Sequence, residues 1–192
     1  MKIGLVGAPG SGKTTLAAKL YARLLEEGIS TARLVSEYGS EHLGMGRKIS
    51  KYIDQKEIMM KQIEREEHHE RCNFDPIICD TCIWMSGIYL QDMIDNNRLT
   101  SPIYTEQKAE YLRTSFSYAE RYDITIFVPM HDDVDKLSRI RIHNSSEARA
   151  IENKIKNYLA HVKTKAIEAP KELFGRDAFI NKLVEDIKDC KR

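Results

Sequence analysis

The sequence predicts an α/β domain built on a parallel β-sheet, and two patterns carry this prediction. Short apolar segments alternate with helical segments along all 192 residues, which is the element order of a parallel sheet with helices on both faces. Several apolar segments are continuous rather than alternating, as in strands that are buried on both sides. A chain of this length suits one domain, residues 1–192.

A glycine-rich loop separates the first predicted strand from the first predicted helix. Residues 2–6 form a short apolar run, and apolar positions at four-residue spacing predict a helix from Lys13 to about Glu27. Between them, the stretch GAPGSGKT from Gly7 to Thr14 fits the pattern G-x-x-x-x-G-K-[ST]. In a strand–loop–helix context, this pattern predicts a phosphate-binding loop, or P-loop.

The fixed positions of this loop have separate chemical roles. Glycines let the backbone turn tightly and bring its N–H groups close to phosphate oxygens. Lys13 adds a cation for the β- and γ-phosphates, and the Thr14 hydroxyl can ligate Mg²⁺. We therefore expect the loop to bind ATP with Mg²⁺, through Gly7, Pro9, Gly10, Ser11, Gly12, Lys13, Thr14 and Thr15.

The later elements follow from apolar periodicity and from breakers such as proline. Strands are expected at 31–36, 77–79, 124–128 and 165–169, and helices at 55–71, 83–95, 105–121, 147–162 and 177–190. Asp54 is the expected N-cap of the helix 55–71, and the segment 40–53 is expected to be irregular or weakly helical. In the helix 105–121, the residues expected to face inward are Ala109, Leu112, Phe116 and Ala119.

Two carboxylates follow neighbouring predicted strands. Glu37 follows the strand 31–36, and Asp80 comes directly after the strand 77–79. The carboxyl ends of parallel strands meet at one edge, so we expect Lys13, Glu37 and Asp80 to lie together. Asp80 is the expected Mg²⁺ ligand beside Thr14. Either carboxylate can serve as the general base for an attacking hydroxyl.

A polar segment from about residue 131 to 145 is expected to form a small lid. It carries Arg139 and Arg141. An arginine in such a lid can close over the transferred phosphoryl group and neutralise its charge. The sequence does not choose between the two.

Composition narrows the range of functions. The net charge is +1, from 30 basic and 29 acidic residues, so global charge does not favour nucleic acid or an anionic membrane as a partner. No apolar run approaches the roughly 18 residues that span a bilayer. The chain begins directly with a predicted strand, so we expect no signal peptide and a cytoplasmic location with reduced cysteines.

The cysteines raise two alternatives that the sequence disfavours. Cys79 and Cys82 form a C-x-x-C pair, but Cys79 lies in a predicted buried strand, which argues against a redox role. A zinc site that adds Cys72 and His69 has the cysteine spacing C-x6-C-x2-C, which matches no common zinc pattern.

Three motifs together resemble small P-loop kinases of the nucleoside and nucleotide kinase type, and most closely the ATPase/kinase domain family that includes the ribosylnicotinamide kinase domain. They are GAPGSGKTTLA at 7–17, Glu37-Tyr38-Gly39, and Asp80-Thr81. The resemblance implies a three-layer αβα fold with a five-stranded parallel sheet of order 2-3-1-4-5. It also implies ATP on the P-loop, with adenine near Pro170.

The resemblance further implies an acceptor cleft lined by the segments after the second and third strands. The acceptor-binding residues expected there are Glu37, Tyr38, Arg47, Asp80 and Trp84. Ser40 stands where the family motif has arginine, and Cys82 stands where a second aspartate often follows. Both departures face the acceptor, and Arg47 is the expected substitute contact for an anionic group.

The sequence thus predicts an ATP- and Mg²⁺-dependent kinase that phosphorylates a nucleoside, a nucleotide or a modified pyrimidine. One alternative is a kinase for a hydroxymethylated base in DNA, as in bacteriophage nucleotide metabolism. The other is a P-loop NTPase switch that acts with a macromolecular partner, although the acid or glutamine that it needs after the fourth strand is absent. The expected partner is a small-molecule acceptor; the oligomeric state, including a dimer, is left open.

Overall fold

The computed structural model describes residues 1–131, 145–162, 166–172 and 174–190. Its five strands form one parallel sheet in the order β2-β3-β1-β4-β5. This confirms the fold class and the strand order expected from the sequence. The strands are β1 (Lys2–Val6), β2 (Arg33–Val35), β3 (Ile77–Cys79), β4 (Ile124–Phe127) and β5 (Ala166–Glu168).

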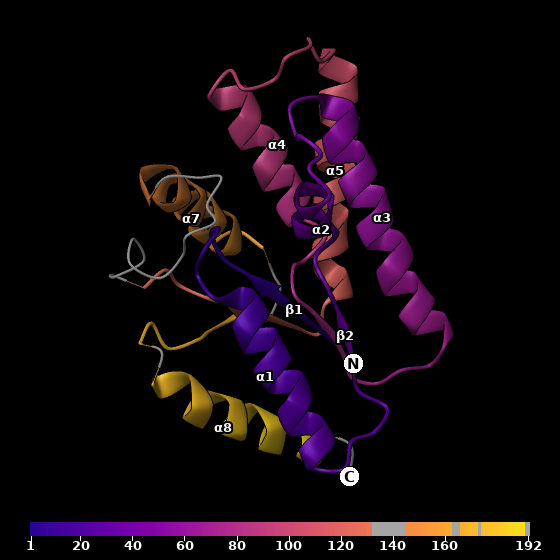
Figure 1. Cartoon of the computed structure of the whole chain (residues 1–192), viewed down its shortest axis with the longest axis vertical. Helices are drawn as coiled ribbons and strands as arrows, with labels where there is room; N and C mark the ends of the chain where they lie inside the picture. Colours follow the sequence, from indigo (N-terminus) through magenta and orange to yellow (C-terminus); the bar gives the residue numbers. More distant parts are fainter. Residues whose placement is uncertain (132–144, 163–165, 173, 191–192) are drawn as a thin grey trace.

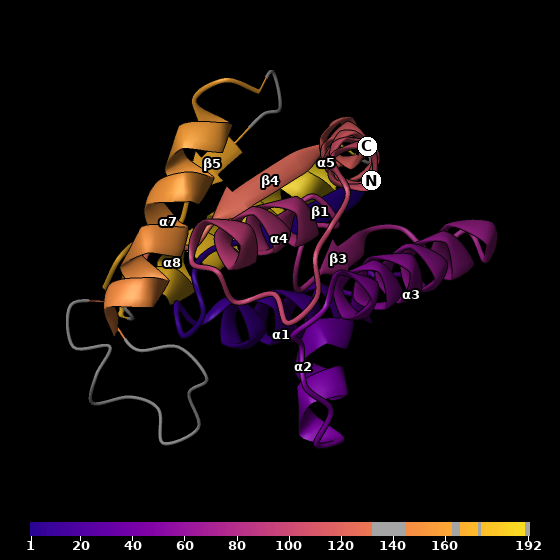
Figure 2. The ribbon, with the colours of Figure 1, turned by 90° about the horizontal axis from the view of Figure 1, so that it is seen from above.

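Helices connect the strands and cover both faces of the sheet, as the alternation of segments predicts. Figures 1 and 2 show α3, α4 and α5 gathered on one side of the molecule. The helices are α1 (Lys13–Glu26), α2 (Tyr38–Gly44), α3 (Tyr52–Arg71), α4 (Met85–Asp95), α5 (Thr105–Ser117), α7 (Ser145–Leu159) and α8 (Gly175–Asp189), with a 3₁₀ turn η1 (Tyr118–Arg121) after α5.

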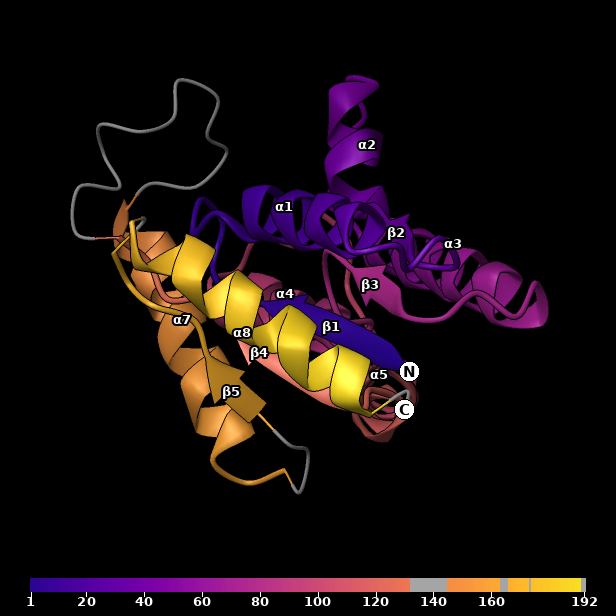
Figure 3. The same ribbon diagram turned by 90° about the horizontal axis from the view of Figure 1, so that it is seen from below.

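One face of the sheet is covered by α1 and α8, which contact each other; in Figure 3, α8 lies in front of β1 and β4. Leu5 of β1 is fully buried there against apolar side chains of both helices. The α1 leucines Leu16, Leu20 and Leu24 recur every four residues and are all buried. This packing fixes α1, and with it the loop before it, rigidly against the end of β1.

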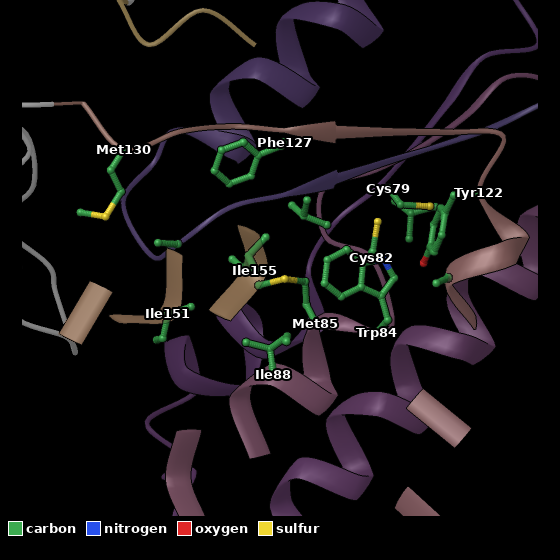
Figure 4. Close-up of a cluster of buried hydrophobic side chains, with 14 of the residues drawn as sticks. Cys79, Cys82, Trp84, Met85, Ile88, Tyr122, Phe127, Met130, Ile151 and Ile155 are labelled. Carbon is green, nitrogen blue, oxygen red and sulfur yellow. The ribbon is translucent and has the colours of Figure 1, made fainter. Parts of the chain in front are cut away.

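The opposite face is covered by α4 and α7. Val6, the neighbour of Leu5, points to this side, because successive side chains of a strand alternate between faces. Figure 4 shows Met85 beside Ile155 of α7 under Phe127 of β4, with Trp84 on the other side of Met85, next to Cys82. A third apolar cluster joins α3 and α5 to α4.

Two local expectations, the start of α3 and part of the buried face of α5, need correction. The helix α3 begins at Tyr52 rather than Gln55, because the Asp54 carboxylate reaches back to the N–H groups of Ser50 and Lys51 at 2.9 and 2.8 Å. The helix α2 occupies part of the segment 40–53, in agreement with the expectation of an irregular or weakly helical segment. Among the described residues, no helix combines the length and apolar character needed to cross a membrane.

The buried face of α5 also differs from the expectation. Ala109 is exposed, and the fully buried positions of α5 are Tyr111 and Ser115. The other residues expected to face inward do so: Leu112 and Phe116 are partly buried against the core, and Ala119 of η1 is buried. The Ser115 hydroxyl lies 3.2 Å from the Trp84 carbonyl oxygen and accepts the Gly87 N–H at 2.9 Å. A polar residue occupies this buried face because the start of α4 satisfies its hydrogen bonds.

Candidate active site

The P-loop joins the end of β1 to the start of α1. Gly10 and Gly12 have φ of 81° and 89°, a left-handed conformation that favours glycine. A Cβ on Gly7 would clash with the Val128 carbonyl oxygen and lie 2.6 Å from Ser11 Oγ. The glycine spacing is therefore required by the geometry of the loop, and the first turn of α1 points its positive end at the same place.

Lys13 is 7 % exposed and folds back over the loop. Its Nζ donates to the Gly7 carbonyl oxygen at 3.0 Å and to the Ala8 carbonyl oxygen at 3.4 Å. Both acceptors are uncharged backbone groups, so the ammonium is held at the mouth of the P-loop without a carboxylate in these contacts.

Thr14 and Asp80 meet beside the P-loop. The Thr14 hydroxyl donates to Asp80 Oδ2 at 2.8 Å, although the two residues are 66 positions apart. The register of the sheet produces this contact, because β1 and β3 are parallel neighbours and both residues follow the carboxyl ends of those strands. The predicted pair of Mg²⁺ ligands is thus brought together by the fold.

The second carboxylate oxygen of Asp80 is buried without a hydrogen-bond partner among the described residues. Burial raises the pKa of Asp80; the Thr14 hydrogen bond opposes this rise, and the nearby Glu37 carboxylate adds to it. A buried anionic oxygen without a partner is costly unless a cation or a donor completes it. This oxygen and the Thr14 hydroxyl fit a Mg²⁺ ion that takes its remaining ligands from phosphates and water.

Glu37 lies on the acceptor side of this pair. The Asp80 N–H donates to the Val35 carbonyl oxygen at 2.9 Å, which holds the ends of β2 and β3 together. Ser40 donates its hydroxyl to Glu37 Oε2 at 2.6 Å. Within the described ranges, no lysine or arginine makes an ion pair with this half-buried carboxylate.

Of the other predicted acceptor residues, Tyr38 and Arg47 are engaged with α3. Tyr38 is 8 % exposed, and its N–H donates to Gln62 Oε1 at 3.0 Å. Its ring lines a surface cavity of about 460 Å³ that contains α3 side chains and no P-loop residue. Arg47 makes an exposed ion pair with Glu57 at 3.1 Å. Neither geometry by itself marks an acceptor contact.

Trp84 requires a correction. Its side chain was expected to contact the acceptor, but the structure buries it to 1 % exposure in the core (Figure 4). Its ring packs against Tyr158 with the centroids 4.5 Å apart. The apolar face between α4 and α7 takes up the indole, so no ring surface is open to a base.

The remaining predicted nucleotide contacts are distributed along the P-loop and the segment after β5. Thr15 is exposed at the first turn of α1, and Ser11 is buried with its hydroxyl unpartnered among the described residues. Pro9 is partly buried, as is Pro170 at the start of the β5–α8 segment. Arg139 and Arg141, with most of the predicted lid, lie outside the described residues and stay a prediction.

The cysteine alternatives find no support in the geometry. Burial holds the pKa of the Cys79 and Cys82 thiols well above their usual range, so both are protonated and poorly nucleophilic at neutral pH. In the described part of the chain, no group of three or more His, Cys, Asp and Glu side chains is arranged to hold a metal ion.

Two residues near the site were not assigned to it from the sequence. Burial, followed by the carboxylates of Glu37 and Asp80, raises the pKa of the phenol of Tyr89 in α4. Arg176 of α8 donates to the carbonyl oxygen of Ser11 in the P-loop at 3.0 Å. The positions 11 and 176 are too far apart in the sequence for any local pattern to join them.

Comparison with known proteins gives matches along most of the chain. A family model described as "AAA domain" matches residues 2–175. The uridine kinase of Leuconostoc citreum (strain KM20) is 26 % identical over 181 residues, which cover 84 % of this chain and 77 % of that protein.

Solved structures share the fold at low sequence identity. Deoxyadenosine kinase from M. mycoides with bound dATP has a TM-score of 0.64 and 14 % identity, over 95 % of this chain and 98 % of that one. The NadR protein in complex with NR has a TM-score of 0.70 and 16 % identity, over 96 % and 50 %. These matches confirm the resemblance to P-loop kinases of nucleosides and nucleotides.

Proposed function

The chain belongs to the AAA domain family, and we propose that it is an ATP- and Mg²⁺-dependent kinase that transfers the γ-phosphoryl group to a nucleoside, nucleotide or related acceptor. The observation that carries the proposal is the meeting of Lys13, Thr14 and Asp80 at the P-loop, with Glu37 beside them. The relatives named uridine kinase and deoxyadenosine kinase support a nucleoside as the acceptor class.

The donor side consists of the P-loop and Lys13. The backbone N–H groups of the loop hold the phosphates, and Lys13 exchanges its bonds to the Gly7 and Ala8 carbonyls for bonds to β- and γ-phosphate oxygens. These contacts hold the γ-phosphoryl group in place and offset the charge that develops on it. Phosphoryl transfer requires mainly such positioning and charge neutralisation.

Thr14 and Asp80 form the metal side. The Thr14 hydroxyl and the unpartnered Asp80 oxygen would hold Mg²⁺, directly or through water. The ion supplies charge neutralisation at the β- and γ-phosphates when it is bound. Asp80 is held for this task by the short β3 strand and by the hydrogen bond of its N–H to the Val35 carbonyl oxygen.

Glu37 forms the acceptor side. We assign it, rather than Asp80, as the carboxylate that orients the acceptor hydroxyl and takes its proton. Asp80 Oδ2 is already occupied by Thr14, whereas Glu37 has a neutral donor, Ser40, and no ion pair in the described residues.

The experiment that tests the proposal uses ATP labelled at the γ-phosphate and a panel of acceptors. The panel contains nucleosides, nucleoside monophosphates, nicotinamide riboside, hydroxymethyl-pyrimidine nucleotides and DNA with a hydroxymethylated base. We expect label to pass to a small-molecule acceptor, and Lys13→Ala to abolish transfer while leaving the fold intact. Transfer to the DNA alone, or undiminished turnover by Lys13→Ala, would contradict the proposal.

A further inference from the structure

Arg176, in the first turn of α8, joins three separate loops around the P-loop. Its Nη1 donates to the Ser11 carbonyl oxygen at 3.0 Å, Nη2 to the Pro129 carbonyl oxygen at 3.3 Å, and Nε to the Pro170 carbonyl oxygen at 3.1 Å. One guanidinium thus holds together the phosphate loop, the end of β4 and the segment after β5.

The charge of Arg176 is buried with no counter-charge among the residues that the structure describes. The residue is 4 % exposed, and no carboxylate of the described residues lies within ion-pair distance of it. Lys2, which is equally buried, pairs with both Glu66 and Glu70. Burial accordingly lowers the pKa of Arg176. A desolvated cation is costly unless an anion compensates for it, and three neutral carbonyls compensate only in part.

The guanidinium lies directly against the phosphate-binding backbone. A Cβ on Gly12 would come within 2.6 Å of Arg176 Nη1. The carbonyl that Nη1 binds belongs to the Ser11–Gly12 peptide, whose N–H lies at the point where such loops receive phosphate. A cation on a carbonyl oxygen polarises the peptide and makes its N–H a stronger donor.

We propose that Arg176 is a positioning residue of the donor-nucleotide site, whose buried charge is balanced by the phosphates of the nucleotide bound on the P-loop. Its bond to Pro170 ties the segment after β5 to the same peptide, so phosphate binding and the placement of that segment are coupled. The inference rests on the proposed function only in requiring a nucleotide on the P-loop. It does not depend on the acceptor.

The test compares uncharged and charged replacements, Arg176→Gln and Arg176→Lys. Dissociation constants for ATP, ADP and adenosine are measured by calorimetry in the presence of Mg²⁺. We expect Arg176→Gln to raise the dissociation constants of ATP and ADP by ~10- to 100-fold, the range for charge-assisted hydrogen bonds. The dissociation constant of adenosine is expected to rise by less than ~3-fold. Arg176→Lys keeps the charge and is expected to recover most of the affinity for ATP.

Arg33→Gln is the matched control. Arg33 also donates to two backbone carbonyls, those of Ser30 and Ala32 at 2.9 and 2.6 Å, but it lies in β2. We expect this variant to bind all three ligands like the wild type. The control therefore separates the loss of a carbonyl-bound arginine from the loss of charge at the P-loop.

Two results would overturn the proposal. One is an Arg176→Gln variant whose dissociation constant for ATP is within ~3-fold of the wild-type value, or whose affinity for adenosine falls as much as its affinity for ATP. The other, decisive if Arg176→Gln does not fold, is a folded Arg176→Lys variant that has lost ATP binding. If the proposed kinase activity were wrong, the wild type would bind ATP but phosphorylate no acceptor. The ratios of the dissociation constants of the variants to those of the wild type would still decide the role of Arg176.

Discussion

Replacing Asp80 by asparagine tests the metal side of the site with the smallest change in shape. The substitution keeps the side-chain volume and an acceptor for the Thr14 hydroxyl, but removes the charge of a residue that is 4 % exposed. A neutral acceptor weakens that hydrogen bond by about 1 kcal/mol, and the lost metal interaction costs about 3 kcal/mol. Together these losses predict a ~10³-fold lower rate of transfer, because each 1.36 kcal/mol is about tenfold.

The stability of this variant is expected to move in the opposite direction. Burial raises the pKa of Asp80, so its charge costs free energy at neutral pH when no cation is bound. Removing that charge relieves the cost of its burial, which outweighs the opposing contribution of the Thr14 hydrogen bond, so the Tm without nucleotide is expected to rise. The assay is ADP release at several Mg²⁺ concentrations, together with thermal unfolding without nucleotide.

Asp123→Asn provides the control. Asp123 accepts the Lys2 N–H at 2.7 Å and precedes β4, at the edge of the sheet opposite the P-loop. We expect it to leave transfer unchanged. If Asp80→Asn keeps a rate and a Mg²⁺ dependence within ~3-fold of the control, or loses activity only through a large fall in Tm, the assignment of Asp80 to the metal site is wrong.

Three further predictions concern the acids. Glu37→Gln should lower kcat by ~10²- to 10⁴-fold without changing ATP affinity; a loss of ATP binding alone would place Glu37 at the metal instead. Because the pKa of Asp80 is raised above 3.8, the rate of transfer should begin to fall on the acid side at a pH above that value. This pH should move lower as the Mg²⁺ concentration is increased, and a pH profile that does not change with Mg²⁺ would contradict the prediction. Hydrogen bonds from Arg65 hold the pKa of Glu41 at about 2. The ionised Glu41 carboxylate therefore stabilises the fold fully above pH 4.5, and this contribution is lost as the pH falls toward 2. The Tm difference between the wild type and Glu41→Gln should shrink over that range, and a widening difference would refute this prediction.

The P-loop and the strands were predictable because their signals are local, whereas the strand order was implied by the resemblance to small P-loop kinases. Gly10 and Gly12 stand where the backbone has a positive φ, and short apolar runs such as Ile77–Cys79 predict strands that are buried on both faces. The contact between Thr14 and Asp80 follows once both are assigned to the carboxyl ends of neighbouring parallel strands. These features could be predicted without knowing how side chains pack in the core.

The parts that were missed depend on packing between distant segments. Trp84 was expected at the acceptor because the sequence cannot show that α7 supplies a surface to bury it. Ser115 is buried because the start of α4, about 30 positions earlier, satisfies its hydroxyl. Arg176 contacts Ser11 across 165 positions and donates to backbone carbonyls. Because every residue has a backbone carbonyl, the residue types in the sequence cannot indicate such a contact.

The most direct test of the account measures ADP and phosphorylated acceptor in the same reaction. The account predicts that an acceptor stimulates ADP formation and that one phosphorylated product appears for each ADP, with both lost together in Lys13→Ala. ADP formation at one rate whatever acceptor is added, without a phosphorylated product, would contradict it. That result would make the protein an ATPase and leave Glu37 without its proposed role.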